Sequence, residues 1–480
     1  MAVDASFGVV GAGASGSVAG TERDNPVRRG RAIDPFGWLP PEFGHAARSP
    51  ILTAVAERVM CRGAEKGDGM AAGGSSGSSG SGGLRRDYDV VVIGGCGHVG
   101  LPLSIASAER GARVVIHDTD EAAVALVNRG GMPFDEPGAL EPLRAALAAG
   151  RLRVSTDPAV SRLADVVVVV IGTPIDEHLN PDPHAIPRAL DASAPYLRDG
   201  QLLILRSTVY PGVTRLVEQD LAAAGLEVDV AFCPERIAEG RAMTELFSLP
   251  QIVGARTPRA AERAAAFFRR LTDRIVLLSP EEAELAKLFT NSWRYVKFAA
   301  TNQFYMIANS QGLDYERIRS AVAEDYPRAA DLPRAGFAAG PCLFKDTMQL
   351  AAFNDNQFWL GHAAMLVNEG LPLYVVSRLE RRYELATMTV GILGMAFKAG
   401  SDDIRSSLSY KLRRILTFRA RRVLCADPYV TRDVSLLPLE KVLAESDLLV
   451  VAAPHPEYAR LETDKPVADV WNVLGGGVLV

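Results

Sequence analysis

Cysteine is scarce in this sequence, and the few cysteines form no pattern. Five of the 480 residues are cysteine, an odd number that is scattered along the chain without the spacing of metal ligands. Such usage fits the reducing cytoplasm better than a disulfide-stapled scaffold of a secreted protein. We therefore expect a cytoplasmic protein with free thiols and no bound metal.

Long apolar runs and an excess of positive charge are also missing. The longest apolar runs, such as Val166–Ile171, have the length of one strand, whereas a membrane span needs about 20 residues. A net charge of -5 argues against a nucleic-acid binder. With 48% hydrophobic residues, the chain has enough apolar side chains for the cores of roughly three domains. We expect a soluble protein that binds neither membrane nor nucleic acid.

Regular periodicity is absent from the first 84 residues. They end in Gly73–Gly83, GGSSGSSGSGG, a composition that behaves as flexible coil. The GAGASG stretch at Gly11–Gly16 is no dinucleotide loop, because no helical pattern follows it. The chain opens MAVDASFG and so lacks the basic residues that precede the apolar core of a secretory signal. Residues 1–84 are predicted to be a disordered extension.

A dinucleotide-binding unit begins at the first strong strand pattern. The apolar run Val90–Ile93 leads into G-x-G-x-x-G, a helical pattern follows, and a second strand at Arg113–His117 ends at Asp118. Glycines permit a tight turn and close approach of a pyrophosphate, and an acid at this place binds the ribose diol. The acid favours NAD over NADP. The candidate cofactor residues of this unit are Gly95, Gly97, His98, Val99, Gly100 and Asp118.

The alternation of strands and helices continues. Three further strands are predicted at Val166–Ile171, Leu202–Arg206 and Val228–Phe232. Because functional residues of doubly wound sheets gather at the carboxyl ends of strands, the residues that follow them are candidates for cofactor or substrate contacts. These candidates are Thr173, Thr208 and Glu235. A helix cap or a turn is the alternative reading for each.

A long helix follows. Ser279–Glu282 is a capping box with proline at the first helical position. The pattern then runs without Gly or Pro to Gln311, which gives about 30 residues and about 45 Å. Lys287, Asn291 and Arg294 share one face. Such a polar stripe usually faces solvent. The apolar residues on the other faces of this helix instead favour a largely buried helix whose polar stripe lines a cavity.

The stretch GFAAGPCLFKD, residues 336–346, places a cysteine among small residues. A thiol is a nucleophile only as the thiolate, and a cation such as Lys345 lowers its pKa, while Asp346 can accept or relay protons. The alternative is that Cys342 is a small buried hydrophobic residue in a loop.

The last third of the chain reads as a second α/β unit. Strands are predicted at Met388–Leu393, Arg422–Ala426 and Asp447–Ala452, with a helix at Ser409–Leu416. The loop between the first strand and the helix carries basic residues at Lys398 and Arg405. Basic side chains there suit a polyphosphate, although solvation at a surface is their ordinary use.

Taken in order, these motifs resemble the UDP-sugar dehydrogenases, the family related to UDP-glucose and UDP-N-acetylmannosamine dehydrogenase. The matching motifs are G-x-G-x-x-G with Asp118, GTP at 172–174, STV at 207–209, CPER at 233–236, AELAKLFTNS at 283–292, GPCLFKD at 340–346 and GMAFKAGSDDIR at 394–405. The resemblance implies an α/β fold of two Rossmann-like doubly wound parallel-sheet domains, residues 85–278 and 385–480, joined by a helical domain with one long helix, residues 279–384.

The resemblance also implies a reaction. The family oxidises the terminal hydroxymethyl group of a UDP-sugar to a carboxylate and consumes two NAD per turnover. By motif position, Cys342 captures the intermediate aldehyde as a thiohemiacetal and then holds a thioester that water hydrolyses. Lys287 and Asn291 would stabilise the oxyanion. Proton transfer and the hydrolytic water would fall to Asp346, Thr208 and Glu235, with Glu239 at a second acid position of the family.

Ligand contacts follow from the same resemblance. The implied NAD contacts outside the glycine loop are Thr173, Thr208 and Arg405. The implied substrate contacts are Glu235, Arg236, Lys287, Asn291, Arg294, Gly336 and Lys398. The helices between Pro280 and Arg382 would form the contact of a homodimer, and a simple helical spacer is their alternative reading. His98 stands where the family usually carries an aromatic residue.

Substrate choice is divided. The CPER motif and residues 291–294 resemble the N-acetylhexosamine branch, whereas CLFKD at 342–346 leans toward UDP-glucose. We favour UDP-N-acetylmannosamine or a related UDP-N-acetylhexosamine, with UDP-glucose 6-dehydrogenase as the alternative. Two readings from outside the reaction stay open: a silent protein that binds NAD or a nucleotide sugar, and a two-electron alcohol dehydrogenase that would tolerate Cys342→Ala.

Overall fold

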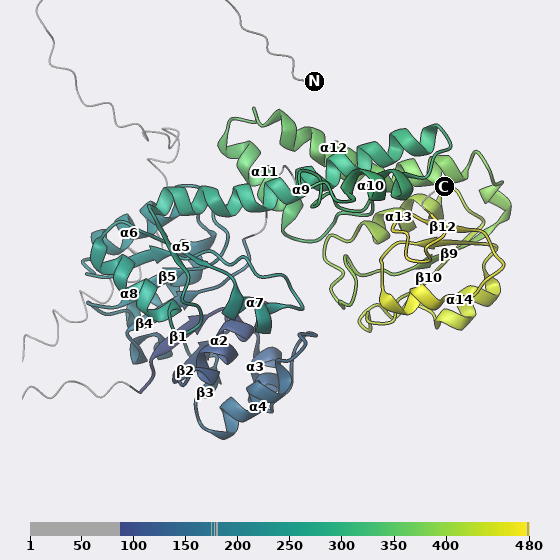
Figure 1. Cartoon of the computed structure of the whole chain (residues 1–480). Coiled ribbons are helices and arrows are strands. Elements are labelled where there is room, and N and C mark those ends of the chain that lie inside the picture. The colour runs from purple at the N-terminus through teal and green to yellow at the C-terminus, as the bar shows by residue number, and fades with distance from the viewer. Residues whose placement is uncertain (1–86, 174, 177, 179–180, 478–479) are drawn as a thin grey trace, which may run out of the picture. The chain divides into compact units, whose positions relative to one another are not determined.

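A computed structural model describes residues 87–173, 175–176, 178, 181–477 and 480 (Figure 1). The predicted disordered extension, residues 1–84, lies outside this range, as does the proline of the GTP motif at position 174. Among the described residues, no helix is both long enough and apolar enough to span a bilayer.

The first sheet has eight strands in the order β3-β2-β1-β4-β5-β6-β7-β8. They are β1 (Val90–Ile93), β2 (Val114–His117), β3 (Leu152–Ser155), β4 (Val166–Val169), β5 (Leu202–Leu205), β6 (Asp229–Phe232), β7 (Gln251–Ala255) and β8 (Ile275–Leu278). All neighbouring pairs are parallel except β6 and β7. Ile93 pairs with both His117 and Val169, so β1, β2 and β4 end at one edge, at the switch point where such sheets bind nucleotides.

Helices cover both faces of this sheet because its strands are apolar on both sides. The helices are α2 (Gly100–Glu109), α3 (Glu121–Asn128), α4 (Leu140–Ala148), α5 (Ala185–Asp191), α6 (Val213–Ala223), α7 (Ala242–Ser248) and α8 (Pro258–Phe268). Val90 and Val92 of β1 belong to the core shared with α2, α4 and α8. Val91 and Ile93 face the opposite way and pack with α5 and α6. The sheet is therefore doubly wound, as predicted.

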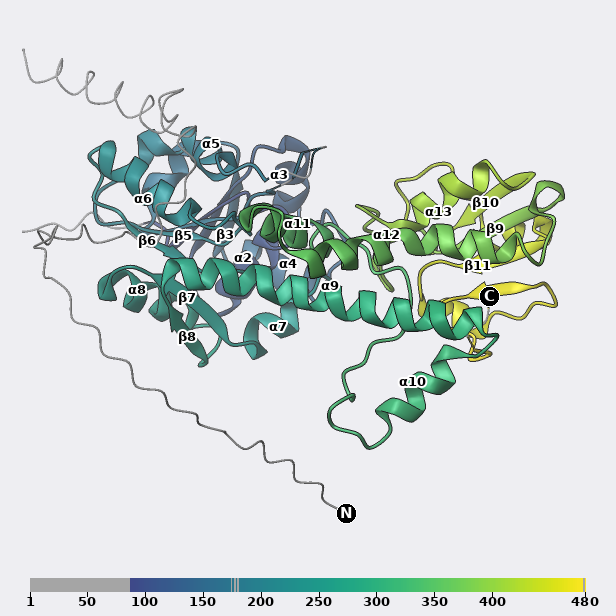
Figure 2. The same cartoon turned by 90° about the horizontal axis from the view of Figure 1, so that it is seen from above.

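The central section is helical. It contains α9 (Pro280–Ser310), α10 (Tyr315–Ala323), α11 (Leu343–Phe353) and α12 (Trp359–Leu379). Figure 2 shows α9 as one unbroken helix, 31 residues long, with α11 and α12 packed against it. Both halves of the predicted capping box form at its start, where the Ser279 hydroxyl accepts from Glu282 N–H and the Glu282 carboxylate accepts from Ser279 N–H. These bonds, with a proline at the first helical position, fix where the helix begins.

The second sheet has four parallel strands in the order β10-β9-β11-β12. They are β9 (Thr389–Leu393), β10 (Arg422–Ala426), β11 (Leu448–Val451) and β12 (Val467–Asp469), with helices α13 (Leu408–Thr417) and α14 (Leu439–Glu445). Leu393 pairs with Ala426 and Val451, so these three strands also end at one edge. Two sheet units, the first parallel except at β6 and β7 and the second wholly parallel, with a helical section between them in sequence, confirm the predicted fold class.

Candidate active site

The glycine loop after β1 has the packing that a bound dinucleotide requires. A Cβ added at Gly100 would lie 2.6 Å from the Cα of Gly95, so the start of α2 tolerates only glycine there. At Gly97 an added Cβ would meet no atom within 4 Å. The Asp118 carboxylate at the end of β2 accepts the Cys96 N–H at 2.8 Å. The loop is closely packed at Gly100 and open at Gly97. The open position leaves room for a pyrophosphate, which fits NAD.

The ring of His98 packs in this loop as the ring of an aromatic residue would. Its ring stacks on Phe134 with centroids 4.0 Å apart and an interplanar angle of 30°. Burial, reinforced by the charge of Arg405, lowers the pKa of His98 to about 4, so the ring is neutral at pH 7. Val99 immediately precedes α2 and supplies no side-chain cap, so no capping side chain occupies the helix N-terminus.

The ends of β4 and β5 are tied to each other and to the cysteine helix. Thr173 donates its hydroxyl hydrogen to the Thr208 carbonyl at 2.5 Å. The Ser207 hydroxyl accepts the Ile171 N–H at 2.7 Å. The Lys345 ammonium, from α11, lies 3.4 Å from the Thr173 hydroxyl oxygen. The GTP and STV motifs therefore meet the segment that carries the cysteine.

Cys342 is exposed and immediately precedes α11. The reading as a small buried hydrophobic residue is wrong. On α11, Asp346 is 0% exposed. One oxygen of its carboxylate accepts a hydrogen bond from the Asn291 amide at 2.5 Å, and the other lies 2.7 Å from the Lys345 ammonium. Lys287 and Asn291 of α9 are buried. The structure thus brings a thiol, an ammonium, an amide and a carboxylate together, while Arg294, one turn along α9, is exposed.

The electrostatics of the cysteine differ from the sequence expectation. Although the side chain reaches solvent, dense packing around it raises the pKa of the Cys342 thiol, and the charge of Asp346 raises it further. Lys287 and Lys345 act in the opposite direction. Lys345 thus lowers the pKa of the thiol as predicted, but it offsets only part of a net increase. Burial also lowers the pKa of Lys287, against the opposing charges of Asp346 and Cys342.

Glu239 belongs to a charged cluster that also contains Lys398, Asp403 and Arg405. Burial raises the pKa of Glu239 to about 7; the charge of Asp403 adds to this, while Arg405 and Lys398 oppose it. Arg405 lies 3.2 Å from the Glu239 carboxylate and 2.6 Å from Asp403. The Lys398 ammonium donates to the Glu239 carbonyl. Glu239 in turn raises the pKa of Cys342, so this cluster acts on the thiol.

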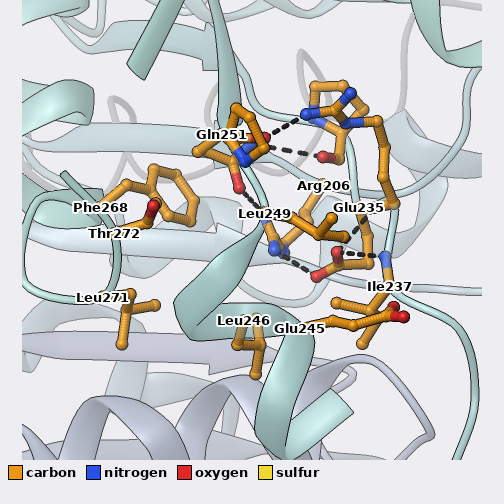
Figure 3. A pocket seen from close by; sticks show the side chains of 13 residues that line it. Arg206, Glu235, Ile237, Glu245, Leu246, Leu249, Gln251, Phe268, Leu271 and Thr272 are labelled. Carbon is orange, nitrogen blue, oxygen red and sulfur yellow. Dashed lines mark hydrogen bonds and ion pairs between the residues drawn. The ribbon is translucent and has the colours of Figure 1, made fainter. Parts of the chain in front are cut away.

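Glu235 lies in a separate polar network (Figure 3). One carboxylate oxygen pairs with the buried guanidinium of Arg206, and the other accepts the N–H groups of Arg236 and Ile237. The Arg236 guanidinium donates to the Pro250 carbonyl. The cavity at this network holds about 10 Å³, about the space of one water, and so is no nucleotide site. The charge of Glu235 nevertheless raises the pKa of Lys287.

Sequence reasoning missed several residues that support the site. Glu136 accepts the N–H groups of Gly240 and Ala242, both at 2.8 Å, and so holds the segment that follows Glu239. Arg206 orients Glu235, and Asp403 orients Arg405. Asp403 stands inside the GSDDIR motif and offered a local signal, whereas the partners of Glu136 and Arg206 are remote in sequence. In the described part of the chain, no cluster of His, Cys, Asp and Glu could hold a metal ion.

A glycine loop that fits NAD, a cysteine beside a buried lysine, and a second nucleotide-type sheet define an NAD-dependent dehydrogenase with a thiol in its site. The chain belongs to the UDP-glucose/GDP-mannose dehydrogenase family. It matches the family's NAD binding domain at residues 89–272, its central domain at 281–369 and its UDP binding domain at 391–476. The predicted family and the NAD cofactor are confirmed.

Individual relatives match most of the chain. The UDP-N-acetyl-D-mannosamine dehydrogenase of Pyrococcus horikoshii is 32% identical in an alignment that covers 77% of this chain and 90% of that protein. The one of Yersinia pestis is 28% identical over 82% of this chain and 99% of its own length. Two solved structures, a Pyrococcus horikoshii UDP-D-ManNAc dehydrogenase and a Pyrobaculum islandicum UDP-glucose dehydrogenase, are each 28% identical with a TM-score of 0.75. The first covers 80% of this chain and 96% of that chain, and the second 83% and 96%.

Proposed function

We propose that the protein oxidises the terminal hydroxymethyl group of a UDP-sugar to a carboxylate in two successive steps, with Cys342 carrying the sugar between them. The observation that carries this proposal is the exposed thiol of Cys342 beside the buried side chains of Lys287, Asn291 and Asp346. A protein that only binds nucleotides needs no such group, and a two-electron dehydrogenase has no use for a nucleophile.

NAD, when bound, supplies the hydride acceptor for both oxidations. We assign its binding to Gly95, Gly97, His98, Val99, Gly100, Asp118, Thr173, Thr208 and Arg405. Asp118 is available to the ribose diol at the end of β2, and Arg405 contributes a cation that is already oriented by Asp403. With NAD bound, these residues would hold it.

In the first half of the reaction, the sugar carbon loses a hydride and its hydroxyl loses a proton, which leaves an aldehyde. The Cys342 sulfur then bonds to the aldehyde carbon, and the carbonyl oxygen becomes an oxyanion. Lys287 and Asn291 stabilise this charge from a desolvated position, where a donor contributes most. Protonation of the oxyanion gives a thiohemiacetal.

The thiol proton needs an acceptor, because the packing around Cys342 raises the pKa of the thiol. Glu239, whose pKa is about 7, suits this task at neutral pH. We assign Asp346, Thr208 and Glu235 to accepting and relaying the proton that the reacting hydroxyl loses and to orienting the hydrolytic water. The side chain of Asp346 is tied to α9 through Asn291, so its carboxylate is fixed relative to the thiol.

In the second half, the thiohemiacetal carbon loses a hydride and its hydroxyl loses a proton, which leaves a thioester. Water adds to the thioester carbonyl, and Lys287 and Asn291 again stabilise the oxyanion. The carbon–sulfur bond then breaks, the sulfur regains a proton, and the sugar leaves as a carboxylate. Substrate contacts are assigned to Glu235, Arg236, Lys287, Asn291, Arg294, Gly336 and Lys398.

We favour UDP-N-acetylmannosamine or a related UDP-N-acetylhexosamine as the substrate. This choice is supported by the CPER motif and by relatives that are named as UDP-N-acetyl-D-mannosamine and NDP-N-acetyl-D-galactosaminuronic acid dehydrogenases. UDP-glucose is the second candidate, because the CLFKD motif leans toward it and a UDP-glucose dehydrogenase shares the fold with the same TM-score as the mannosamine enzyme.

The test is NADH formation from a panel of UDP-sugars, with the NADH counted per sugar consumed. Two NADH per UDP-N-acetylhexosamine and little turnover of UDP-glucose are expected. The reverse preference would move the assignment to UDP-glucose. One NADH per sugar would identify an alcohol dehydrogenase, and none with any sugar, despite binding, would identify a silent nucleotide binder.

The rate is expected to depend on pH through Glu239. Because the pKa of this carboxyl is about 7 and a base must be deprotonated, kcat should fall by about tenfold per pH unit below pH 7. Glu239→Gln should remove this fall of kcat at acidic pH and should lower kcat at neutral pH by about 10²- to 10⁴-fold. The exposed Glu141→Gln is the control. An unchanged fall of kcat at acidic pH in Glu239→Gln would assign the titration to another group.

Folding raises the pKa of the same carboxyl from an ordinary value of 4.5, so the folded protein binds this proton more tightly than the unfolded chain does. The contribution of Glu239 to stability is therefore fully present below about pH 4.5. It is lost as the pH rises through about 7.

We propose that the protein is a homodimer joined through its central helices. Large apolar side chains are exposed there, including Phe304 and Ile307 on α9 and Ile318 and Val322 on α10, and they line a groove of about 310 Å³. Sedimentation should show a dimer that Ile307→Glu converts to a monomer, while Phe418→Glu, an exposed position just after α13, leaves it intact. A monomeric wild-type protein would contradict this proposal.

The remaining assignments are proposals of the same kind. We place the domain boundaries at residues 85–278, 279–384 and 385–480, close to the three family matches. We also propose the cytoplasm as the site of action, because its reducing conditions keep an exposed thiol such as Cys342 free for catalysis.

A further inference from the structure

The loop that delivers Cys342 is anchored to α9 by one buried amide. Asn302 is 0% exposed, and its side chain pairs with the backbone of Gly336 in both directions. The Gly336 N–H donates to the Asn302 Oδ1 at 2.9 Å, and the Asn302 Nδ2 donates to the Gly336 carbonyl at 3.0 Å. Two short bonds to the backbone of one residue, one on each of its flanking peptide groups, fix its position and orientation, because neither group has water as an alternative partner.

A second amide fixes the first. The Asn302 Nδ2 also donates to the Asn368 Oδ1 at 2.9 Å, and the Asn368 Nδ2 donates to the Tyr295 carbonyl at 3.1 Å. Asn368 lies on α12 and is 0% exposed. The chain of bonds therefore joins α12, two turns of α9 and the loop. The direction of each amide is set by its neighbour, since the oxygen and nitrogen of Asn302 each face a group of the opposite kind.

The loop has no room to adjust if this anchor is lost. At Gly336 the backbone φ is +154°, and an added Cβ would lie 2.4 Å from the Trp471 ring. At Gly340 the φ is +104°, and an added Cβ would lie 2.6 Å from the Phe397 ring. Both glycines thus press their backbones against aromatic rings. Two residues after Gly340, the chain reaches Cys342 and enters α11, which Asp346 ties back to α9 through Asn291.

We infer that Asn302 and Asn368 are positioning residues for the nucleophile, which set where the Cys342 sulfur lies relative to Lys287 and Asn291. This inference rests on the proposed function and extends it. The cysteine segment is held to α9 on both sides, by Asn302 before the thiol and by Asn291 after it. An error of about 1 Å in placing a reacting atom lowers a rate by about 10²-fold. The first oxidation does not need the sulfur, so a misplaced thiol should fail to capture the aldehyde.

The test compares Asn302→Asp with the wild type and with Asn309→Ala. The aspartate has the same shape but sets a carboxylate oxygen against the Gly336 carbonyl and the Asn368 Oδ1. Asn309 is a buried amide of the same helix whose side chain donates to Tyr305 and not to Gly336. NADH per sugar, aldehyde captured by a hydrazine reagent, and the rate at which iodoacetamide labels Cys342 are measured, together with the thermal unfolding midpoint.

Asn302→Asp should lower uronate formation by about 10²-fold, lower the yield from two NADH per sugar toward one, and release aldehyde. The labelling rate of Cys342 should change at least several-fold, while Asn309→Ala keeps two NADH and the wild-type labelling rate. Asn368→Asp should repeat the effect of Asn302→Asp. The inference would be overturned if Asn302→Asp kept two NADH per sugar, released no aldehyde and lost activity only in proportion to its unfolded fraction.

Failure of the proposed function has a different signature. In that case the wild type itself gives no NADH, or one, with every UDP-sugar. The labelling rates then still decide whether Asn302 positions the thiol, because alkylation of Cys342 needs neither substrate nor cofactor. Equal rates in the wild type and Asn302→Asp would refute the positioning role.

Discussion

Cys342→Ala is expected to stop uronate formation while the protein stays folded and binds NAD. Without the sulfur, the aldehyde has no covalent partner, so the yield should not exceed one NADH per sugar. The rate of complete oxidation should fall by about 10⁴-fold or more, the order of loss found when a covalent nucleophile is removed. The exposed position of Cys342 makes the substitution mild for folding.

The matched control is Cys425→Ala, which removes another free thiol. Cys425 is buried in β10 and contributes to the core of the second sheet. This variant should lose stability by roughly 1 kcal/mol and keep two NADH per sugar. Full four-electron oxidation by Cys342→Ala, counted by NADH and by the isolated uronate, would contradict the covalent mechanism.

Lys287→Met should lower kcat by about 10²- to 10³-fold with a smaller effect on KM. Methionine keeps the apolar stem but removes the ammonium, and loss of one oxyanion donor costs about 2.7–4 kcal/mol of transition-state stabilisation. Stability should not fall, because the ammonium of Lys287 is buried and its pKa is lowered by desolvation. Asp346 keeps Lys345 as its ionic partner in this variant.

Lys297→Met, on the same helix, serves as the control. Lys297 pairs with the exposed Asp331 at 3.0 Å, an ion pair of the surface type that contributes about 0–1 kcal/mol. Its removal should leave kcat unchanged. If both lysine variants lowered kcat equally, the loss would come from disruption of α9 and not from removal of the donor to the oxyanion.

The parts of the fold with strong local signals were predictable from the sequence. The β1 strand, the glycine loop and α2 are continuous along the chain, and Gly100 has a steric reason within the loop itself, because an added Cβ would meet Gly95. The start of α9 is set by bonds within four residues. In contrast, β3 alternates buried and exposed residues over only four positions, and β7 pairs antiparallel with β6. Pairing between remote segments decides such strands, and no local pattern predicted them.

The candidate site, like the fold, combines features with a local sequence signal and features that depend on remote segments. Spacing along α9 placed Lys287, Asn291 and Arg294 on one face, but the structure buries only the first two and leaves Arg294 exposed. The net pKa of Cys342 could not be read from its neighbours in sequence, because packing outweighs the nearby cations. The pairing of Glu235 with Arg206 and the anchor at Asn302 join residues about 30 positions apart. The catalytic roles themselves stay predictions.

The most direct test of the covalent account is peptide mass spectrometry of the wild-type enzyme, quenched with acid during turnover of its UDP-sugar and NAD. The account predicts an acyl adduct of the oxidised nucleotide sugar on Cys342, absent without NAD and removed by hydroxylamine as a thioester is. Turnover to uronate with Cys342 unmodified at every quench time, or with the adduct on Cys96, Cys233 or Cys425, would contradict it.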